Sequence, residues 1–368
     1  MLFIETMSPL HIGNGEILSP YTDYIYDDKN GTIYVMDKRK IEAALFELEN
    51  NETVLDEYIN KLINIRGGHV NYSLKQFLEE HQIDYKSLAK VIIKTNADIK
   101  FEEIHEQLKS ASRPYIPGSS IKGAIRTALL FHHRKQSGYS IDQALVDLFG
   151  DKSLKKDKAP NGEDIFGKTD KDILKFLHVS DTTFLKPNEV EVVKTFRFDL
   201  NKKSGTIPIT LEVIPEGKKL EFRLQCKARS AYHSLEQPFS YLFENQGGEK
   251  KILQLVNQFT KYFLESELRL LQKQKIKELD GLISFYERLL NTAEQFEKEQ
   301  NGAVLRLGSG KTFLDNTITN LFSQDDLNQL RKKLRLGTYH PFPKTRSVIY
   351  QSNEYRSPLG WVYVSFST

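Results

Sequence analysis

The residues with the clearest chemical potential surround a predicted helix start near Pro117. Pro117 and Gly118 predict a turn, and Ser119 or Ser120 is expected to cap the helix that follows. Acids usually occupy a helix start because its partial positive charge attracts anions, yet no Asp or Glu occurs from 107 to 141. A helix start with free N–H groups, hydroxyls and cations favours phosphate. The candidate phosphate contacts are Arg113, Gly118, Ser119, Ser120, Lys122 and Arg126.

A second candidate anion site is the glycine-rich run from Gly308 to Thr312. A nucleotide-binding P-loop would need another glycine where this chain has Leu305, so the run does not predict an NTPase. Its two glycines can instead expose backbone N–H groups that clamp an RNA backbone, while nearby cations add charge. A tight turn without a ligand is the alternative. The candidate contacts here are Arg306, Gly308, Gly310 and Lys311.

Near the N-terminus, a histidine lies beside two glycines. His11 could serve as a general acid or base in RNA cleavage. The sequence assigns it no partner histidine or lysine, so stacking or hydrogen bonding to RNA is the favoured interpretation. Asp23 is interpreted as a solvated carboxylate at a strand edge and not as a nuclease residue. The candidate contacts in this loop are His11, Gly13, Asn14 and Gly15.

The C-terminal part of the chain carries basic residues with interleaved aromatics. Residues 327–353 contain no acid, and Tyr339 and Phe342 lie among cations and prolines. Such loops suit single-stranded RNA, whose bases stack on rings and whose phosphates meet Lys or Arg. A packed surface loop is the alternative. The candidate contacts are Arg335, Lys344 and Arg346.

The composition is that of an ordinary globular protein long enough for two domains. The chain has 368 residues, 39% hydrophobic and 27% charged, and its net charge of +3 would not alone indicate nucleic acid. Cys226 is the single cysteine, which excludes an internal disulfide and a cysteine metal cage. No cluster has metal-ligand spacing, and no secretory signal or membrane-spanning run is visible. We therefore expect no cofactor, no metal and a cytoplasmic location.

Strand-like and helix-like stretches are both frequent, which predicts an α+β fold. The Asn-Gly pair at 30–31 predicts a hairpin between 24–26 and 32–36. A second predicted hairpin joins 206–214 to 220–225. Periodicity of three and four between 249 and 299 indicates a packed helix pair. The remaining expectations are strands at 2–6, 303–307 and 358–366, helices at 38–63 and 117–135, a helical insertion at 73–109, and an exposed charged loop at 150–172.

Tyr115-Ile-Pro-Gly-Ser-Ser-Ile-Lys-Gly-Ala-Ile-Arg-Thr127 resembles the characteristic motif of the RAMP superfamily, the RNA-binding subunits of CRISPR effector complexes. Four further segments occur in the expected order. Together they most resemble the subunit at the crRNA 3′ end of type III-A (Csm) complexes, while the helical region 239–300 matches no motif. These segments are Pro9-Leu-His-Ile-Gly-Asn-Gly15 with Asp23-Tyr-Ile-Tyr-Asp27, Leu177-His-Val-Ser-Asp181, Leu305-Arg-Leu-Gly-Ser-Gly-Lys-Thr312 and Leu336-Gly-Thr-Tyr339.

The resemblance implies two ferredoxin-like (RRM-like) domains with helical insertions, over residues 1–190 and 191–368. It also implies a non-catalytic subunit that caps the guide RNA at its 3′ end and supports crRNA maturation in antiviral defence. The implied partners are crRNA, the adjacent backbone subunit, the small subunit of the filament and host nucleases that trim the 3′ end. Two alternatives stay open: an endoribonuclease that uses His11 or Asp23, and a protein-assembly module built on 249–299.

Overall fold

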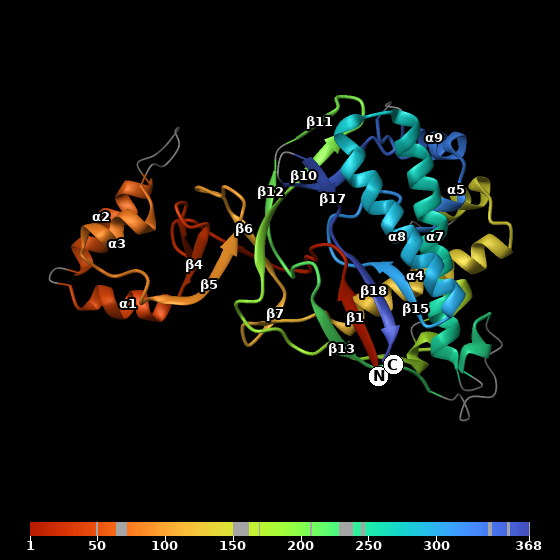
Figure 1. The fold of residues 1–368 in the computed structure, drawn as a ribbon, viewed down its shortest axis with the longest axis horizontal. Coiled ribbons are helices and arrows are strands. Elements are labelled where there is room, and N and C mark those ends of the chain that lie inside the picture. Colours follow the sequence, from red (N-terminus) through yellow and green to blue (C-terminus); the bar gives the residue numbers. More distant parts are fainter. Residues whose placement is uncertain are drawn as a thin grey trace.

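The computed structural model is a mixture of helices and sheets, so the α+β prediction is confirmed (Figure 1). The predicted loop at 150–172 and the motif ending at Tyr339 fall partly outside the residues that the structure describes. Those are residues 1–48, 51–63, 72–149, 162–168, 170–206, 208–227, 238–243, 247–337, 341–351 and 354–367.

A four-stranded antiparallel sheet joins the two ends of the chain. β1 (Leu2–Thr6) pairs with β13 (Lys219–Phe222) on one side and with β18 (Trp361–Phe366) on the other, and β18 also pairs with β15 (Gly302–Arg306). Side chains alternate between buried and partly buried along β1, as expected for a strand with one face on the core. The opening and closing strands predicted from the sequence are confirmed, and they lie side by side.

The larger sheet has ten strands and mixes segments from both halves of the chain. β10 (Glu191–Asp199) is its branch point, because it pairs with strands on both sides and also with β16 (Thr345–Gln351). The other members are β2 (Gly13–Leu18), β6 (Ile104–Gln107), β12 (Ile209–Val213), β5 (Ala89–Thr95), β4 (Thr32–Met36), β3 (Tyr24–Asp27), β11 (Ser204–Gly205) and β17 (Glu354–Ser357). Two short pairs are separate: β9 (Leu177–Val179) with β14 (Leu224–Cys226), and β7 (Lys109–Ser110) with β8 (Arg113–Pro114).

Long helices cover the four-stranded sheet. α4 (Gly118–Gln136) places its apolar stripe in the same core as β1 and β18, and α7 (Gly248–Gln274) packs against α8 (Asp280–Glu299) and β15. The predicted helix pair is therefore confirmed. The smaller helices beside them are α5 (Ile141–Phe149), α6 (Glu163–Phe166), α9 (Gln324–Lys333), and the 3-10 turns η1 (Ile173–Phe176), η2 (Ser240–Phe243), η3 (Lys277–Leu279) and η4 (Ile318–Leu321).

A helical lobe projects from the far end of the larger sheet (Figure 1). It consists of α1 (Lys38–Phe46), α2 (Asn51–Ile63) and α3 (Leu74–Glu80), which pack with the β3–β4 hairpin around their own small core. The hairpin with its Asn-Gly turn is confirmed. The insertion predicted as helical at 73–109 is wrong over its second part, because β5 and β6 there complete the larger sheet.

The hairpin predicted between 206–214 and 220–225 is also wrong. β12 pairs with β10 and β6 in the larger sheet, whereas β13 pairs with β1 in the four-stranded sheet. The connection at 214–218 thus passes from one sheet to the other, and alternation along each strand cannot reveal which strand it pairs with. Both sheets use strands from either side of residue 190, and the division into two domains at that point stays a prediction.

Candidate nucleic-acid interface

Two predicted loops from opposite ends of the chain meet at one end of the four-stranded sheet. β1 and β15 are both antiparallel to β18, so they run in the same direction and their C-terminal ends lie at the same end of the sheet. The loop after β1 contains His11, and the loop after β15 contains Ser309. The Ser309 backbone N–H donates a hydrogen bond to the His11 carbonyl oxygen at 2.8 Å. The sheet therefore brings together two motifs that are almost 300 residues apart.

Gly308 makes this close approach possible. Its φ is +67°, and a Cβ atom at this position would lie 2.2 Å from the His11 carbonyl oxygen. Gly310 also has a positive φ, of +79°. Within the described part of the chain, the backbone N–H groups of Gly310 and Lys311 donate no hydrogen bond. Unpaired N–H groups in a turn with left-handed glycines are typical anion-binding groups.

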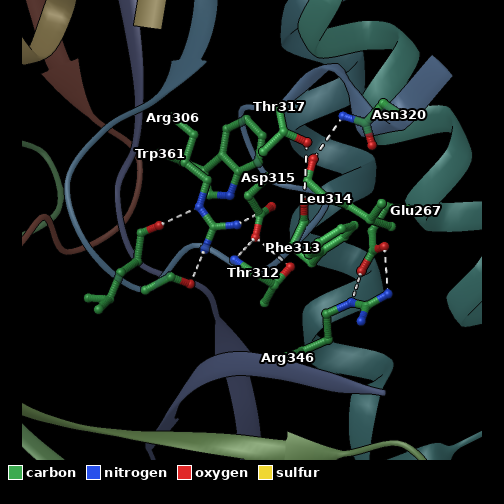
Figure 2. Close-up of polar contacts among 12 residues, drawn as sticks. Glu267, Arg306, Thr312, Phe313, Leu314, Asp315, Thr317, Asn320, Arg346 and Trp361 are labelled. Carbon is green, nitrogen blue, oxygen red and sulfur yellow. Dashed lines mark hydrogen bonds and ion pairs between the residues drawn. The ribbon is translucent and has the colours of Figure 1, made fainter. Parts of the chain in front are cut away.

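A buried network beneath the loop holds it in this conformation (Figure 2). The Arg306 guanidinium group donates to the carbonyl oxygens of Leu359 and Gly310, at 2.9 and 3.0 Å, and forms an ion pair with Asp315. Asp315 in turn accepts hydrogen bonds from the backbone and side chain of Thr312. Arg306 is only 6% exposed, so it supports the loop from the interior. The prediction that it contacts RNA directly does not fit this position.

Arg346 has a similar internal role. Its guanidinium group forms a buried ion pair with Glu267 of α7 (Figure 2). It also donates to the carbonyl oxygens of Pro343 and Thr345. Arg346 is 4% exposed and Glu267 is 3% exposed. Direct contact with a phosphate would require the guanidinium group to leave this pair. We therefore assign Arg346, like Arg306, to the support of the loops and not to their surface.

A groove of about 900 Å³ opens beside the glycine loop, and we call it the cationic groove. No acidic side chain is among the described residues that line it. Lys344 reaches it while forming an ion pair with the buried Asp199, and exposed Lys311 keeps no such partner among the described residues. From the predicted contacts the groove gathers His11, Gly310, Lys311 and Lys344.

The cationic groove also contains residues that sequence reasoning missed. Arg197 and Thr195 of β10 form part of its wall, as do His105 of β6 and the rings of Phe313 and Phe342. Arg197 is exposed, and its place two residues after Thr195 puts both on one face of the strand. That alternation was visible in the sequence, but nothing there indicated that this face meets the glycine loop.

His11 lies at the base of the cationic groove and is 4% exposed. Its Nδ1 lies 2.7 Å from the Glu212 carbonyl oxygen, which can only accept, so Nδ1 carries the proton. Burial lowers the pKa of His11, and the ring is therefore neutral at physiological pH. The backbone at Gly13 passes close to Nε2, since a Cβ atom there would lie 3.1 Å from it. The following residues Asn14 and Gly15 are exposed at the start of β2.

The helix start at Gly118 differs from the prediction. Pro117 is the N-cap residue, and neither Ser119 nor Ser120 caps the helix through its side chain. The Gly118 N–H donates instead to the Asp181 carboxylate at 2.8 Å. A Cβ atom on Gly118 would lie 2.3 Å from the carbonyl oxygen of Val179, so the glycine permits tight packing against the 177–181 motif.

The cations of this helix are also engaged within the protein. Lys122 donates to the Leu177 carbonyl oxygen at 3.0 Å, and burial lowers its pKa. Arg126 forms an ion pair with Asp172 at 2.6 Å. The sequence contains no acid near this helix start, but the fold supplies two from the following segment. A protein carboxylate thus occupies part of the site that was predicted for phosphate.

The remaining predicted contacts lie apart from the glycine loop. No residue between 113 and 126 lines the cationic groove. Arg113 is exposed and lies over the Phe184 ring at 5.1 Å. Arg335 is exposed too, and its neighbour Leu336 belongs to the wall of the groove. Arg335 is therefore a further cation within reach of an RNA strand that leaves the groove.

The described residues offer neither a metal site nor a membrane span. No group of three or more His, Cys, Asp or Glu side chains among them could hold a metal ion. None of the described helices combines the length and the apolar character that spanning a bilayer requires.

Known proteins resemble this chain in sequence over most of its length. The family model for the RAMP superfamily matches residues 3–314. The Csm5 protein of a CRISPR system in Methanocaldococcus jannaschii is 28% identical, over 97% of this chain and 87% of that protein. The Csm5 protein of Streptococcus thermophilus is 27% identical, over 64% of this chain and 66% of that protein.

Two solved structures share the fold. One chain of the cryo-EM structure of a Csm–crRNA–target RNA ternary complex, from a type III-A CRISPR-Cas system, superposes with a TM-score of 0.73 at 24% identity. That likeness covers 99% of this chain and 100% of the other. The crystal structure of T. onnurineus Csm5 gives 0.66 at 23% identity, over 98% and 99% of the two chains. The family match and the fold agree with the motif resemblance, and the chain belongs to the RAMP superfamily.

Proposed function

We propose that this protein is a crRNA-binding subunit of a type III-A CRISPR (Csm) complex, and that the cationic groove holds the guide. The observation that carries the proposal is the meeting of unpaired N–H groups with Lys311 and Arg197 in an acid-free groove. Relatives named Csm5, aligned over most of the chain, support the type of complex.

The groove suits a single strand whose sequence varies from guide to guide. Backbone N–H groups and lysines recognise phosphate and do not distinguish bases. The ring of Phe313 is partly exposed in the groove and offers a stacking surface, and stacking tolerates every base. Exposed residues 13–15 at the start of β2 follow His11 and extend the contact along the RNA strand.

We place the protein at the 3′ end of the guide, where it protects the RNA and leaves trimming to other nucleases. The partners are crRNA, the adjacent backbone subunit and the small subunit, and the complex works in the cytoplasm. Recovery of short repeat–spacer RNAs with the purified protein would support this role. Clean protein without RNA would argue against it.

The proposed role is non-catalytic. His11 is only 4% exposed, and its ring is fixed by the hydrogen bond from Nδ1 to the Glu212 carbonyl oxygen. A general base must reach the proton that it removes, within about 2.6–3.2 Å. We expect His11→Ala to leave RNA cleavage at the background level of the native protein. Cleavage that is present in the native protein and abolished in this variant would favour the endoribonuclease alternative.

The direct test is the salt dependence of RNA binding. Lys311→Gln with Arg197→Gln removes two groove cations, and Lys273→Gln with Lys298→Gln removes two exposed cations of α7 and α8. For single-stranded RNA the slope of log affinity against log salt changes by about 0.7 for each phosphate that the protein neutralises. The slope of the groove variant should therefore be shallower by about 1.4, and that of the control should not change. Equal slopes would refute the groove, and affinity independent of salt would favour the protein-assembly alternative.

A further inference from the structure

A second groove lies along β10, next to the cationic groove. Its volume is about 950 Å³, and it runs between β10, the β16–β17 hairpin and α8. Glu191, Val193 and Lys194 line this groove, Thr195 and Arg197 line the cationic groove, and Phe196 lines both. Residues 191–192 pair with β5 and residues 195–199 pair with β16, so Val193 and Lys194 lie between these two neighbouring strands.

One side of the second groove is acidic. Asp98, Glu191 and Glu216 all line it. Neither Glu191 nor Glu216 forms an ion pair with any residue in the described ranges. Glu191 is only partly exposed, and its burial together with the charge of Glu216 raises its pKa. Two carboxylates held close together in a partly buried place attract a cation from outside.

The other side is apolar and basic. Phe285 and Ile349 form part of its floor, and Tyr350 is 42% exposed while packing edge-on against Phe196. Arg288 of α8 and Arg356 of β17 line the same side. Because Thr195 pairs with Ile349 in an antiparallel ladder, Ile349 and Tyr350 lie three to four residues along β10 from Glu191, which is about 10–13 Å of extended strand. We call this second groove the bipolar groove.

The charges decide which class of ligand fits. An RNA strand carries the same negative charge at every nucleotide, and its phosphates would meet the three acids. A protein segment can present both signs and an apolar side chain. We propose that the bipolar groove docks a segment of another protein chain, with a Lys or Arg for Glu191 and Glu216 and an aromatic or aliphatic side chain, about four extended residues away, against Tyr350.

Docking in the bipolar groove leaves the cationic groove open, because Phe196 is the one described residue that lines both. The protein could then hold RNA in one groove and a neighbouring subunit in the other. The proposal does not require RNA binding in the cationic groove, but the choice of peptides below rests on the proposed function. The two can therefore fail separately.

The test uses the full chain and fluorescein-labelled peptides, each about 15 residues long, that tile the other Csm subunits of the same complex. Anisotropy should identify peptides that carry a basic residue near an apolar one. Glu191→Lys with Glu216→Lys should weaken their binding at least tenfold. Glu265→Lys with Glu278→Lys, two exposed acids of the α7–α8 region, is the matched control and should bind as the native chain does.

Two further variants guard against misfolding. Glu191→Gln with Glu216→Gln removes the charge without reversing it, and Tyr350→Ala tests the apolar contact; both should weaken binding, and Lys311→Gln should not. Absence of any bound peptide, or equal binding by native and Glu191/Glu216 variants, overturns the proposal. Crosslinking of RNA to Tyr350 would show that the groove binds RNA. Self-association that the charge reversal abolishes would show that it binds a second copy of this chain. Either result overturns the proposal. Peptide binding by a chain that fails to bind RNA would support this site and refute the proposed function.

Discussion

Replacing Gly308 with alanine tests whether the two loops must touch. The φ of +67° alone costs an L-residue about 1–2 kcal/mol. The new Cβ atom would also lie 2.2 Å from the His11 carbonyl oxygen, so the loops must separate by about 1 Å to restore ordinary contact at 3.4 Å. That movement breaks the Ser309–His11 hydrogen bond, worth about 0.5–1.5 kcal/mol. Gly308→Ala should therefore destabilise the protein by about 1.5–3.5 kcal/mol.

Gly217→Ala is the matched control. Gly217 has a φ of +80°, but a Cβ atom there would meet nothing within 4 Å. It carries the conformational cost alone, about 1–2 kcal/mol. Urea unfolding measures the free energy of each variant, and anisotropy with a short single-stranded RNA measures affinity. Equal losses of stability, or unchanged RNA affinity in folded Gly308→Ala, would refute the reasoning that the loop contact shapes the groove.

Three further predictions concern charge and burial. Arg346→Met should destabilise the protein by about 3–5 kcal/mol, because it leaves Glu267 buried without a partner; the double change with Glu267→Gln should recover part of this loss in urea unfolding. Arg306→Met should weaken RNA binding with no change in salt slope, since this cation supports the loop and does not touch phosphate; a slope shallower by about 0.7 would contradict its internal position. His11 should make stability fall as the pH drops below its ordinary pKa of 6.5, because its folded pKa is lower and the unfolded state binds the proton more readily; His11→Gln should reduce this dependence in pH-series unfolding, and His132 should retain the rest.

Local features of the fold were predictable because they depend on neighbours in the chain. The helix at 117–135 is α4, and its stripe of Ile121, Ile125 and Leu129 is buried. The Asn-Gly pair at 30–31 correctly predicted the position of the β3–β4 hairpin. The strand at 206–214 was also recognised, at β12, but its pairing partner was wrong, since the choice between β10 and β13 depends on residues far away.

The candidate site shows the same division. Glycines and cations identified the loops at 11–15 and 308–312 as contact segments, and the structure joins them. The distribution of charge along the chain did not predict that Asp181 and Asp172, which lie outside the acid-free window, would contact α4. It also did not predict that Arg306 is buried, because a basic residue beside a glycine loop can point inward as well as outward.

The family and the helix and strand types of most segments could be predicted from the sequence alone, and glycines and cations predicted which loops would bind phosphate. Which of those cations remain free for a ligand depends on the fold. A charge is available to a ligand when no carboxylate of the same protein has already neutralised it, and such partners lie 9 residues away for Arg306 and 79 for Arg346. The fold sets those distances in space, and it also places the two grooves along β10.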